Sequence, residues 1–279
     1  MQRRIGEWIA RGDFLRVKEI LDEKHPYIYE DELATKARAL IRDLTLRILP
    51  VVDGYKKLLG VISRNDILKV TSSVSPIKVK GIMNKPKYTA TINDDVYSAI
   101  KEMLRLDEWC IPVVESSQDK TYRGVLKLEG FIKVKFKTER NKLSKPVSEI
   151  MSKKVVTCTP EDEIDNVWRL MQKKSFAGLP VVKKDVLVGI VTQLDLLKSG
   201  AVMPSFESRK GRFRKPSKVS AVMKTNVIAV KPTVTVQRTV EFMIKKGIGR
   251  VPVKDEKGRL VGIVDREDVV KLLIGEKFE

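Results

Sequence analysis

The residue types that most often carry catalysis or bind metals are few in this chain. It contains one histidine, His25, and two cysteines, Cys110 and Cys158. Zinc sites, Cys–His pairs and Ser–His–Asp triads all require such residues beside a second ligand or base. His25 precedes Pro26 in a predicted turn, and both cysteines lie in apolar, strand-like runs without a CxxC spacing. We expect two buried thiols and neither metal-based nor nucleophilic catalysis.

Motifs of the common enzyme classes are absent from the sequence. There is no phosphate-binding P-loop, no GxGxxG turn after a strand and no HExxH zinc helix. These motifs place a phosphate, a dinucleotide or a metal-bound water. The sequence therefore predicts a protein that is not an enzyme and requires no cofactor.

Basic residues are the most prominent chemical feature. The chain has 55 Lys and Arg against 36 Asp and Glu, a formal net charge of +19. Such an excess attracts polyanions and speeds their encounter with the protein. A thermophile's charge-rich surface is an alternative explanation, because 33% of the residues are charged, but such surfaces mix both signs. The net charge therefore favours an anionic macromolecular partner.

Two basic runs interleave cations with aromatic rings. Their candidate nucleic-acid-binding residues are Lys133, Lys135, Lys137, Arg140 and Lys142 in the first run and Arg209, Lys210, Arg212, Phe213, Arg214 and Lys215 in the second. Alternation in an extended segment would place the charges on one side, for phosphate contact with base stacking. A solvated linker is the alternative for each run. Without an RRM or KH motif, recognition would be by shape and phosphate rather than by sequence. Because the ribosome is the most abundant polyanion in the cytosol, we expect RNA in a ribosomal subunit as the partner.

The size and hydropathy of the chain suit a globular protein of two domains. At 279 residues it can form two cores of about 100–150 residues each. No stretch approaches the roughly 20 apolar residues that a membrane span needs. Charges interrupt the first residues before a signal peptide could form. We expect a cytoplasmic protein without a membrane partner.

Four copies of one pattern make up nearly the whole chain. They centre on the proline-containing runs Arg47–Val52, Cys110–Val114, Gly178–Val182 and Arg250–Val253, each followed by an apolar strand that begins near Gly60, Gly124, Gly189 or Gly262. An apolar pair, ending at Leu21, Met83, Met151 or Met223, lies 29 residues before each proline. Four ungapped matches over that distance indicate an internal repeat.

Each copy also predicts an amphipathic helix between the apolar pair and the proline. Spacings of three and four place one apolar stripe against a sheet, with the members Ala34, Ala37, Ile41; Val96, Ile100, Met103; Ile164, Trp168, Met171; and Val236, Val240, Met243. Thr159 and Pro160 suggest the start of the third helix. Each unit is therefore predicted to be strand, helix, strand, strand and short helix.

The repeats divide the sequence into units and joins. We predict an extra N-terminal helix over residues 1–16, repeats over 17–73, 79–137, 147–200 and 219–275, and basic linkers over 138–146 and 201–218. The first linker separates two halves of two repeats each.

The repeat unit resembles the CBS domain. The segment from Leu179 to Leu196 shows the likeness best, with Leu-Pro-Val-Val, a turn, Gly-Ile-Val-Thr and then Asp-Leu. The resemblance covers the chain from about Val17 to Leu273. A stand-alone chain of four repeats and this size resembles archaeal proteins above all. The resemblance implies an α/β fold of four CBS repeats paired into two Bateman modules that form a flat disc, as in the gamma subunit of AMP-activated protein kinase. CBS discs commonly dimerise, which implies a homodimer.

The resemblance also implies sites for an adenine nucleotide such as AMP, ADP or ATP. In the family, an Asp after the Gly-led strand binds the ribose hydroxyls, and a Ser or Thr three residues earlier contacts phosphate. Ser63 and Asp66 match in the first repeat, and Thr192 and Asp195 match in the third. A carboxylate suits a vicinal diol, and a hydroxyl at a helix N-terminus suits an anion. A structural capping role is the alternative for both aspartates.

The other two repeats depart from this pattern. The second has Lys127 and Gly130 and lacks the carboxylate, so its ribose site is expected to be lost. The fourth keeps Asp268 but has Asp265 in place of the hydroxyl, and that carboxylate would repel phosphate. Arg47 and Arg250 precede their Pro-Val strands, where the kinase gamma subunit has phosphate-binding residues.

These observations lead to two functional hypotheses. The first is a regulatory docking protein that binds RNA in a ribosomal particle, as a stress or hibernation-type factor, and has nucleotide-sensing clefts. This hypothesis accounts for the net charge, and the chain resembles basic archaeal CBS proteins that are associated with ribosomes. The alternative is an adenine-nucleotide-sensing regulatory subunit of a partner enzyme or kinase that does not bind RNA.

Overall fold

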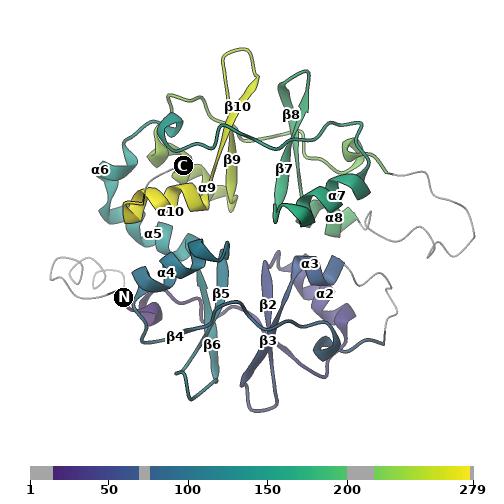
Figure 1. The fold of residues 1–279 in the computed structure, drawn as a ribbon, viewed down its shortest axis with the longest axis vertical. Coiled ribbons are helices and arrows are strands. Elements are labelled where there is room, and N and C mark those ends of the chain that lie inside the picture. Colours follow the sequence, from purple (N-terminus) through teal and green to yellow (C-terminus); the bar gives the residue numbers. More distant parts are fainter. Residues whose placement is uncertain (1–14, 69–75, 200–216, 277–279) are drawn as a thin grey trace, which may run out of the picture.

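The computed structural model describes residues 15–68, 76–199 and 217–276 (Figure 1). The predicted helix over residues 1–16 therefore falls almost entirely outside the described residues. The same is true of the second basic run, with Arg209, Lys210, Arg212, Phe213, Arg214 and Lys215, and of most of the predicted linker over residues 201–218.

Each repeat is built around an antiparallel strand pair whose first strand contains the repeated proline. These pairs are β2 (Ile48–Val52) with β3 (Leu58–Ser63), β5 (Cys110–Val114) with β6 (Tyr122–Lys127), β7 (Gly178–Lys183) with β8 (Val186–Thr192), and β9 (Arg250–Lys254) with β10 (Leu260–Asp265). In the first two repeats, β1 (Ile28–Tyr29) and β4 (Ala90–Thr91) add a parallel strand. The third and fourth repeats have a single parallel bridge there.

The four predicted amphipathic helices are α2 (Ala34–Asp43), α4 (Val96–Arg105), α7 (Ile164–Lys173) and α9 (Val236–Lys246). Every predicted stripe residue is buried, which confirms the periodicity argument. The predicted start of the third helix was wrong, because α7 begins at Ile164 rather than beside Thr159. The Thr159 amide donates to Asp162 Oδ2 at 2.8 Å and closes a turn before the helix.

A second helix follows each strand pair: α3 (Arg64–Leu68), α5 (Leu128–Thr138), α8 (Gln193–Ser199) and α10 (Arg266–Ile274). The helix α6 (Arg140–Leu143) follows α5, and a short 3-10 helix opens each repeat, at Val17–Glu19, Val79–Gly81, Val147–Glu149 and Val219–Ala221. The sequence pattern and the structure therefore agree on an α/β repeat.

Neighbouring repeats pair because the segment that opens one repeat crosses onto the second strand of the other. Asp22 bridges Val125 in β6, and Asn84 bridges Val61 in β3. The repeated glycine permits this close approach. A Cβ on Gly124 would lie 2.5 Å from the Asp22 carbonyl oxygen, and its φ of +150° also disfavours other residues.

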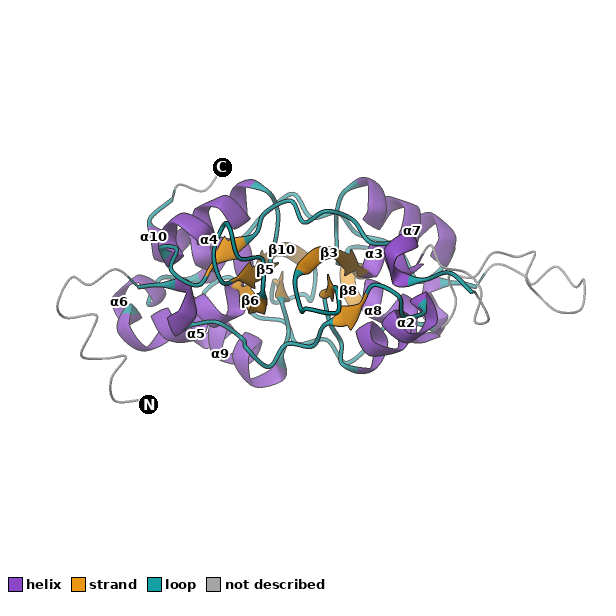
Figure 2. Cartoon of the chain, turned by 90° about the horizontal axis from the view of Figure 1, so that it is seen from below, coloured by secondary structure: helices purple, strands orange, loops and turns teal. Residues whose placement is uncertain are grey.

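The two pairs pack side by side into a flat disc, which Figure 1 shows face on and Figure 2 shows edge on. One hydrophobic core is shared by the second and fourth repeats, with α5 against α10, and another by the first and third repeats. This arrangement confirms the predicted fold of four repeats in two modules. Within the described ranges, no helix has the length and apolarity to cross a membrane.

The first basic run is helical, so the prediction of an extended segment was wrong. Lys133, Lys135 and Lys137 lie in α5, while Arg140 and Lys142 lie in α6. Lys135 is buried, with its Nζ 4.8 Å from the centre of the Tyr97 ring. The apolar residues between the lysines face the core, and this packing stabilises a helix over an extended chain.

Candidate ligand-binding site

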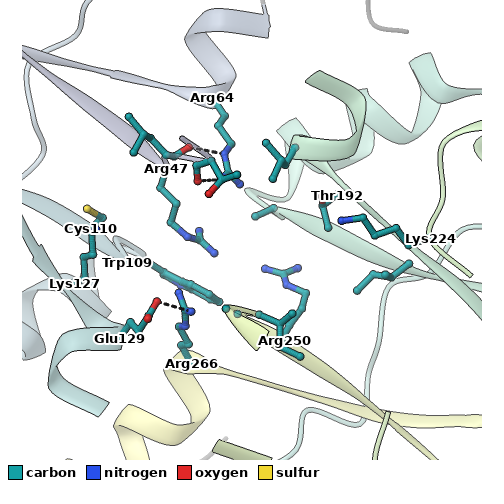
Figure 3. Close-up of a pocket in the computed structure, with 18 of the residues that line it drawn as sticks. Arg47, Arg64, Trp109, Cys110, Lys127, Glu129, Thr192, Lys224, Arg250 and Arg266 are labelled. Atoms are coloured by element: carbon teal, nitrogen blue, oxygen red, sulfur yellow. Dashed lines mark hydrogen bonds and ion pairs between the residues drawn. The ribbon is translucent and has the colours of Figure 1, made fainter. Parts of the chain in front are cut away.

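A cavity of about 410 Å³ lies where the four repeats meet at the centre of the disc. Its lining includes Arg47, Arg64, Arg250 and Arg266, each at or next to the first residue of a strand or helix. Figure 3 shows the Arg47 and Arg250 side chains pointing toward one another across this space. Because two arginines come from each module, the cationic centre exists only when the modules are packed together.

The arginines are crowded by burial and by one another. Burial, followed by the charges of Arg64, Arg250 and Arg266, lowers the pKa of Arg47 to about 9. Burial lowers the pKa of Arg64 to about 10 and also lowers the pKa values of Arg250 and Arg266. Burial is the largest cause in each case, and a bound anion would offset the lost hydration of these guanidinium groups.

Counter-charges are unevenly distributed around this centre. Arg266 forms an ion pair with Glu129 at 2.7 Å. Arg64 donates instead to the backbone oxygens of Leu46, at 2.7 Å, and Thr45, at 2.5 Å. Among the residues that the structure describes, Arg47, Arg64 and Arg250 form no ion pair, but the charges of Asp265 and Glu267 act on Arg250. The positive charge is therefore least compensated on the side of the first repeat.

Trp109 fills the middle of the cavity wall. The guanidinium carbon of Arg47 lies 4.0 Å from the centre of its ring, and that of Arg250 lies 5.7 Å away. Its indole Nε1 donates to Glu267 Oε1 at 2.7 Å. A Cβ on Gly249 would lie 2.8 Å from this ring, so glycine makes room for it. Cation–π contacts hold both guanidinium groups in place without neutralising them.

The two predicted hydroxyl–aspartate pairs have the same local geometry. Ser63 Oγ donates to Asp66 Oδ2 at 2.6 Å, and Thr192 Oγ1 donates to Asp195 Oδ2 at 2.5 Å. The backbone amides of Ser63 and Thr192 donate to the same carboxylate oxygens. These contacts stabilise the starts of α3 and α8, as the capping alternative predicts.

The second oxygen of each aspartate distinguishes the two pairs. Asp66 Oδ1 accepts a hydrogen bond from Asn84 Nδ2 at 2.9 Å, whereas Asp195 Oδ1 is 3.0 Å from Lys224 Nζ. Thr192 and Lys224 line the central cavity, but neither Ser63 nor Asp66 does. Of the four residues in the two pairs, only Thr192 lines the cavity, and Asp195 lies behind it, paired with the lining residue Lys224.

The cavity extends from Thr192 into an apolar cleft between the third and fourth repeats. Ile190, Val227, Ile228 and Ile248 line this part. Apolar walls beside a few polar groups are typical of sites for a flat organic ring. The cavity therefore combines a cleft that could hold a base with a centre that could hold phosphates.

The fourth repeat presents buried acids instead. The Asp265 amide donates to Asp268 Oδ2 at 2.8 Å, and Asp265 Oδ1 accepts from the Glu267 amide at 2.8 Å. Burial, then the charge of Asp265, raises the pKa of Asp268 to about 8 and that of Glu267 to about 7. The Asp265 carboxyl is thus bonded within its own repeat, and no hydroxyl stands at this position to contact a phosphate.

The scarce nucleophiles and metal ligands occupy structural positions. Cys110 and Cys158 are buried, as predicted, and burial raises the pKa of each thiol to about 12. His25 directly follows a turn at residues 23–24 and is buried, with Nε2 3.0 Å from the Ile48 oxygen, and burial lowers its pKa. Lys127 pairs with Asp22 at 2.6 Å. The described residues contain no cluster of three or more potential metal ligands.

Sequence reasoning missed Arg64, Arg266, Trp109 and Lys224. Arg64 and Arg266 directly follow the hydroxyl-position residues Ser63 and Asp265, so their shared place in the repeat was a usable signal. Trp109 stands three residues before its proline, as Arg47 does. Aligning the repeats would have revealed these shared positions, but not that the four sites meet in one cavity.

The model of the CBS domain family matches residues 17–73, 79–136, 147–201 and 219–275. Because these matches cover most of the chain, the protein belongs to the CBS domain family. It is a CBS-domain regulatory protein of four repeats.

Two archaeal proteins are similar over nearly the full length. The uncharacterized protein MJ1225 of Methanocaldococcus jannaschii is 26% identical over 280 residues, which cover 92% of this chain and 99% of that protein. Its crystal structure, described as a proposed archaeal homologue of g-AMPK, has a TM-score of 0.81 at 25% identity, with the same coverage. A conserved protein of Pyrococcus horikoshii has a TM-score of 0.63 at 25% identity and covers 93% of this chain and 100% of its own.

A match to an enzyme is confined to part of that enzyme. Inosine-5'-monophosphate dehydrogenase of Thermoplasma acidophilum is 36% identical over 121 residues, which cover 43% of this chain and 22% of the enzyme. The similarity thus does not extend over the rest of the dehydrogenase.

Proposed function

We propose that this protein is a regulatory subunit that senses an adenine nucleotide, namely AMP, ADP or ATP, in the cleft between its third and fourth repeats. The base lies between the apolar walls near Val227 and Ile248. The ribose hydroxyls displace Lys224 Nζ and donate hydrogen bonds to Asp195 Oδ1. The phosphates pass Thr192 and reach the central arginines. The observation that carries this proposal is the continuity of one cavity from the apolar cleft to the arginines.

The arrangement suits regulation because the ligand contacts both modules. Arg47 and Arg64 belong to the first module, whereas Thr192 and Arg250 belong to the second. Phosphates bound between them relieve the repulsion among the guanidinium groups and favour the packed disc. A ligand that favours one packing can alter a surface read by a partner enzyme. The likeness to MJ1225, described as a proposed homologue of g-AMPK, supports this role.

Calorimetric titration with ATP and AMP tests the proposal. We expect the Arg47→Gln/Arg64→Gln double variant to bind ATP on the order of a hundredfold more weakly, because each charged hydrogen bond contributes about 1.5–3 kcal/mol. Ser63→Ala is the matched control, since Ser63 does not line the cavity, and it should leave the affinity unchanged. Absence of binding to wild-type protein by any adenine nucleotide would contradict the proposal.

RNA docking in a ribosomal particle is the second candidate function, favoured by the net charge of +19. The first basic run supports it only in part, because Lys135 is buried and Lys133 pairs with Glu129 at 2.5 Å. Lys137 and Arg140 are exposed and could contact phosphate. Sedimentation of a cell lysate at low salt should place the protein with ribosomal particles, and recovery only at the top of the gradient would reject this function.

The cytoplasmic location and the homodimer stay predictions.

A further inference from the structure

The clefts beside Asp66 and Asp195 are built from equivalent positions of the two modules. Residues of the second module lie 140 positions after their counterparts in the segments that open and close each cleft, as Met83 and Met223 or Pro112 and Pro252 show. By this alignment, Lys87 corresponds to Val227, and Glu108 corresponds to Ile248. Two apolar residues in the walls of one cleft are therefore charged residues in the other.

The two charged residues, which both belong to the second repeat, form an ion pair at the positions of these apolar residues. Lys87 Nζ lies 2.9 Å from Glu108 Oε1 and donates to the Leu106 oxygen at 3.1 Å. Lys87 lies three residues after Asn84, whose side chain donates to Asp66 Oδ1, so Lys87 belongs to the segment that lies against the first module's aspartate. In the second module, Val227 and Ile248 both line the open cavity.

An ion pair in this position opposes the binding of a purine ring. Apolar faces that lose little hydration bind such a ring. Binding beside Lys87 and Glu108 would instead remove water from both charged groups and break their ion pair. The Lys87 side chain is 60% exposed and that of Glu108 is 26% exposed. Surface pairs of this kind contribute little to stability, so the pair can be replaced without unfolding the module.

We propose that the Lys87–Glu108 pair closes the Ser63/Asp66 cleft to nucleotides, so that the chain holds one nucleotide, in the second module. This inference rests on the proposed function. It explains how two clefts with the same hydroxyl–aspartate pair differ in ligand binding. Specificity then lies in the walls of the cleft rather than in the residues that contact ribose and phosphate.

Titration calorimetry with ADP measures the number of sites directly. We expect one site in the wild-type protein and two in the Lys87→Val/Glu108→Ile variant, which copies the walls of the second module. The reciprocal variant, Val227→Lys/Ile248→Glu, should lose its only site. Circular dichroism and melting temperature verify that each variant is folded. Lys87→Met, a single change at an exposed position, is a second variant that removes the ion pair and opens the Ser63/Asp66 cleft.

The outcomes separate this inference from the proposed function. Two sites in the wild-type protein, or one site in both folded opening variants, would overturn the role of the ion pair and leave nucleotide sensing in place. No binding by the wild-type protein would overturn the proposed function instead. Both the inference and the proposed function would be supported by one site in the wild-type protein and two in the Lys87→Val/Glu108→Ile variant, if adding Asp66→Ala to that variant removes the second site.

Discussion

The seam between the first and third repeats and the seam between the second and fourth repeats use the same positions with different chemistry. Across the first seam, Gln193 Nε2 donates to Asn65 Oδ1 at 3.1 Å. Across the second seam, the equivalent residues Arg266 and Glu129 form an ion pair at 2.7 Å. One seam is thus neutral, and the other holds a partly buried charge pair.

This difference determines where the central cavity is most positive. Glu129 neutralises Arg266, whereas Arg64, at the corresponding place in the first repeat, is bonded only to backbone oxygens. Arg47 lies beside it and is stacked on Trp109. The neutral seam therefore adjoins the more positive side of the cavity, and the charged seam holds a compensated arginine.

The largest expected difference between the seams is in stability. Glu129→Ala leaves Arg266 uncompensated, which should reduce the free energy of unfolding by about 3 kcal/mol, as when one partner of a buried pair is removed. Asn65→Ala removes a neutral hydrogen bond and should cost about 1 kcal/mol. Urea denaturation of both variants measures the two losses. Equal losses would show that the charge pair does not distinguish the seams.

A smaller effect is expected from pH on the acid cluster beside the charged seam. The pKa of Asp268 is about 8 in the folded protein, above the value of about 4 in an unfolded chain. The native state therefore keeps a proton that the unfolded state releases, and stability falls as pH rises between these values. Asp268→Asn should reduce this fall between pH 6 and pH 8 by on the order of 1 kcal/mol.

Thermal unfolding across this pH range provides the measurement. Asp31→Asn is the control, because Lys80 and Lys78 lower the pKa of Asp31 and its titration lies far below pH 6. That variant should show the wild-type slope. An unchanged slope in Asp268→Asn would indicate that Asp268 is ionised in the native state.

Local sequence patterns predicted the repeat unit well because short-range physics determines it. Strand and helix periodicities identified the buried stripes, such as Ile164, Trp168 and Met171 in α7. The start of that helix was missed because hydrogen bonds in both directions between Thr159 and Asp162 form a turn that precedes the helix. The helical packing of Lys135 was missed because charge composition does not reveal which lysine stems lie on the core.

The sequence by itself determined that one unit is repeated four times and where each repeat carries a hydroxyl, an aspartate or an arginine. Only the tertiary structure decided that Arg47, Arg64, Arg250 and Arg266 share one cavity and that Thr192, but not Ser63, opens into it. The physical reason is distance along the chain. Periodicity depends on residues within a few positions of one another, whereas this cavity depends on how two modules pack across an interface.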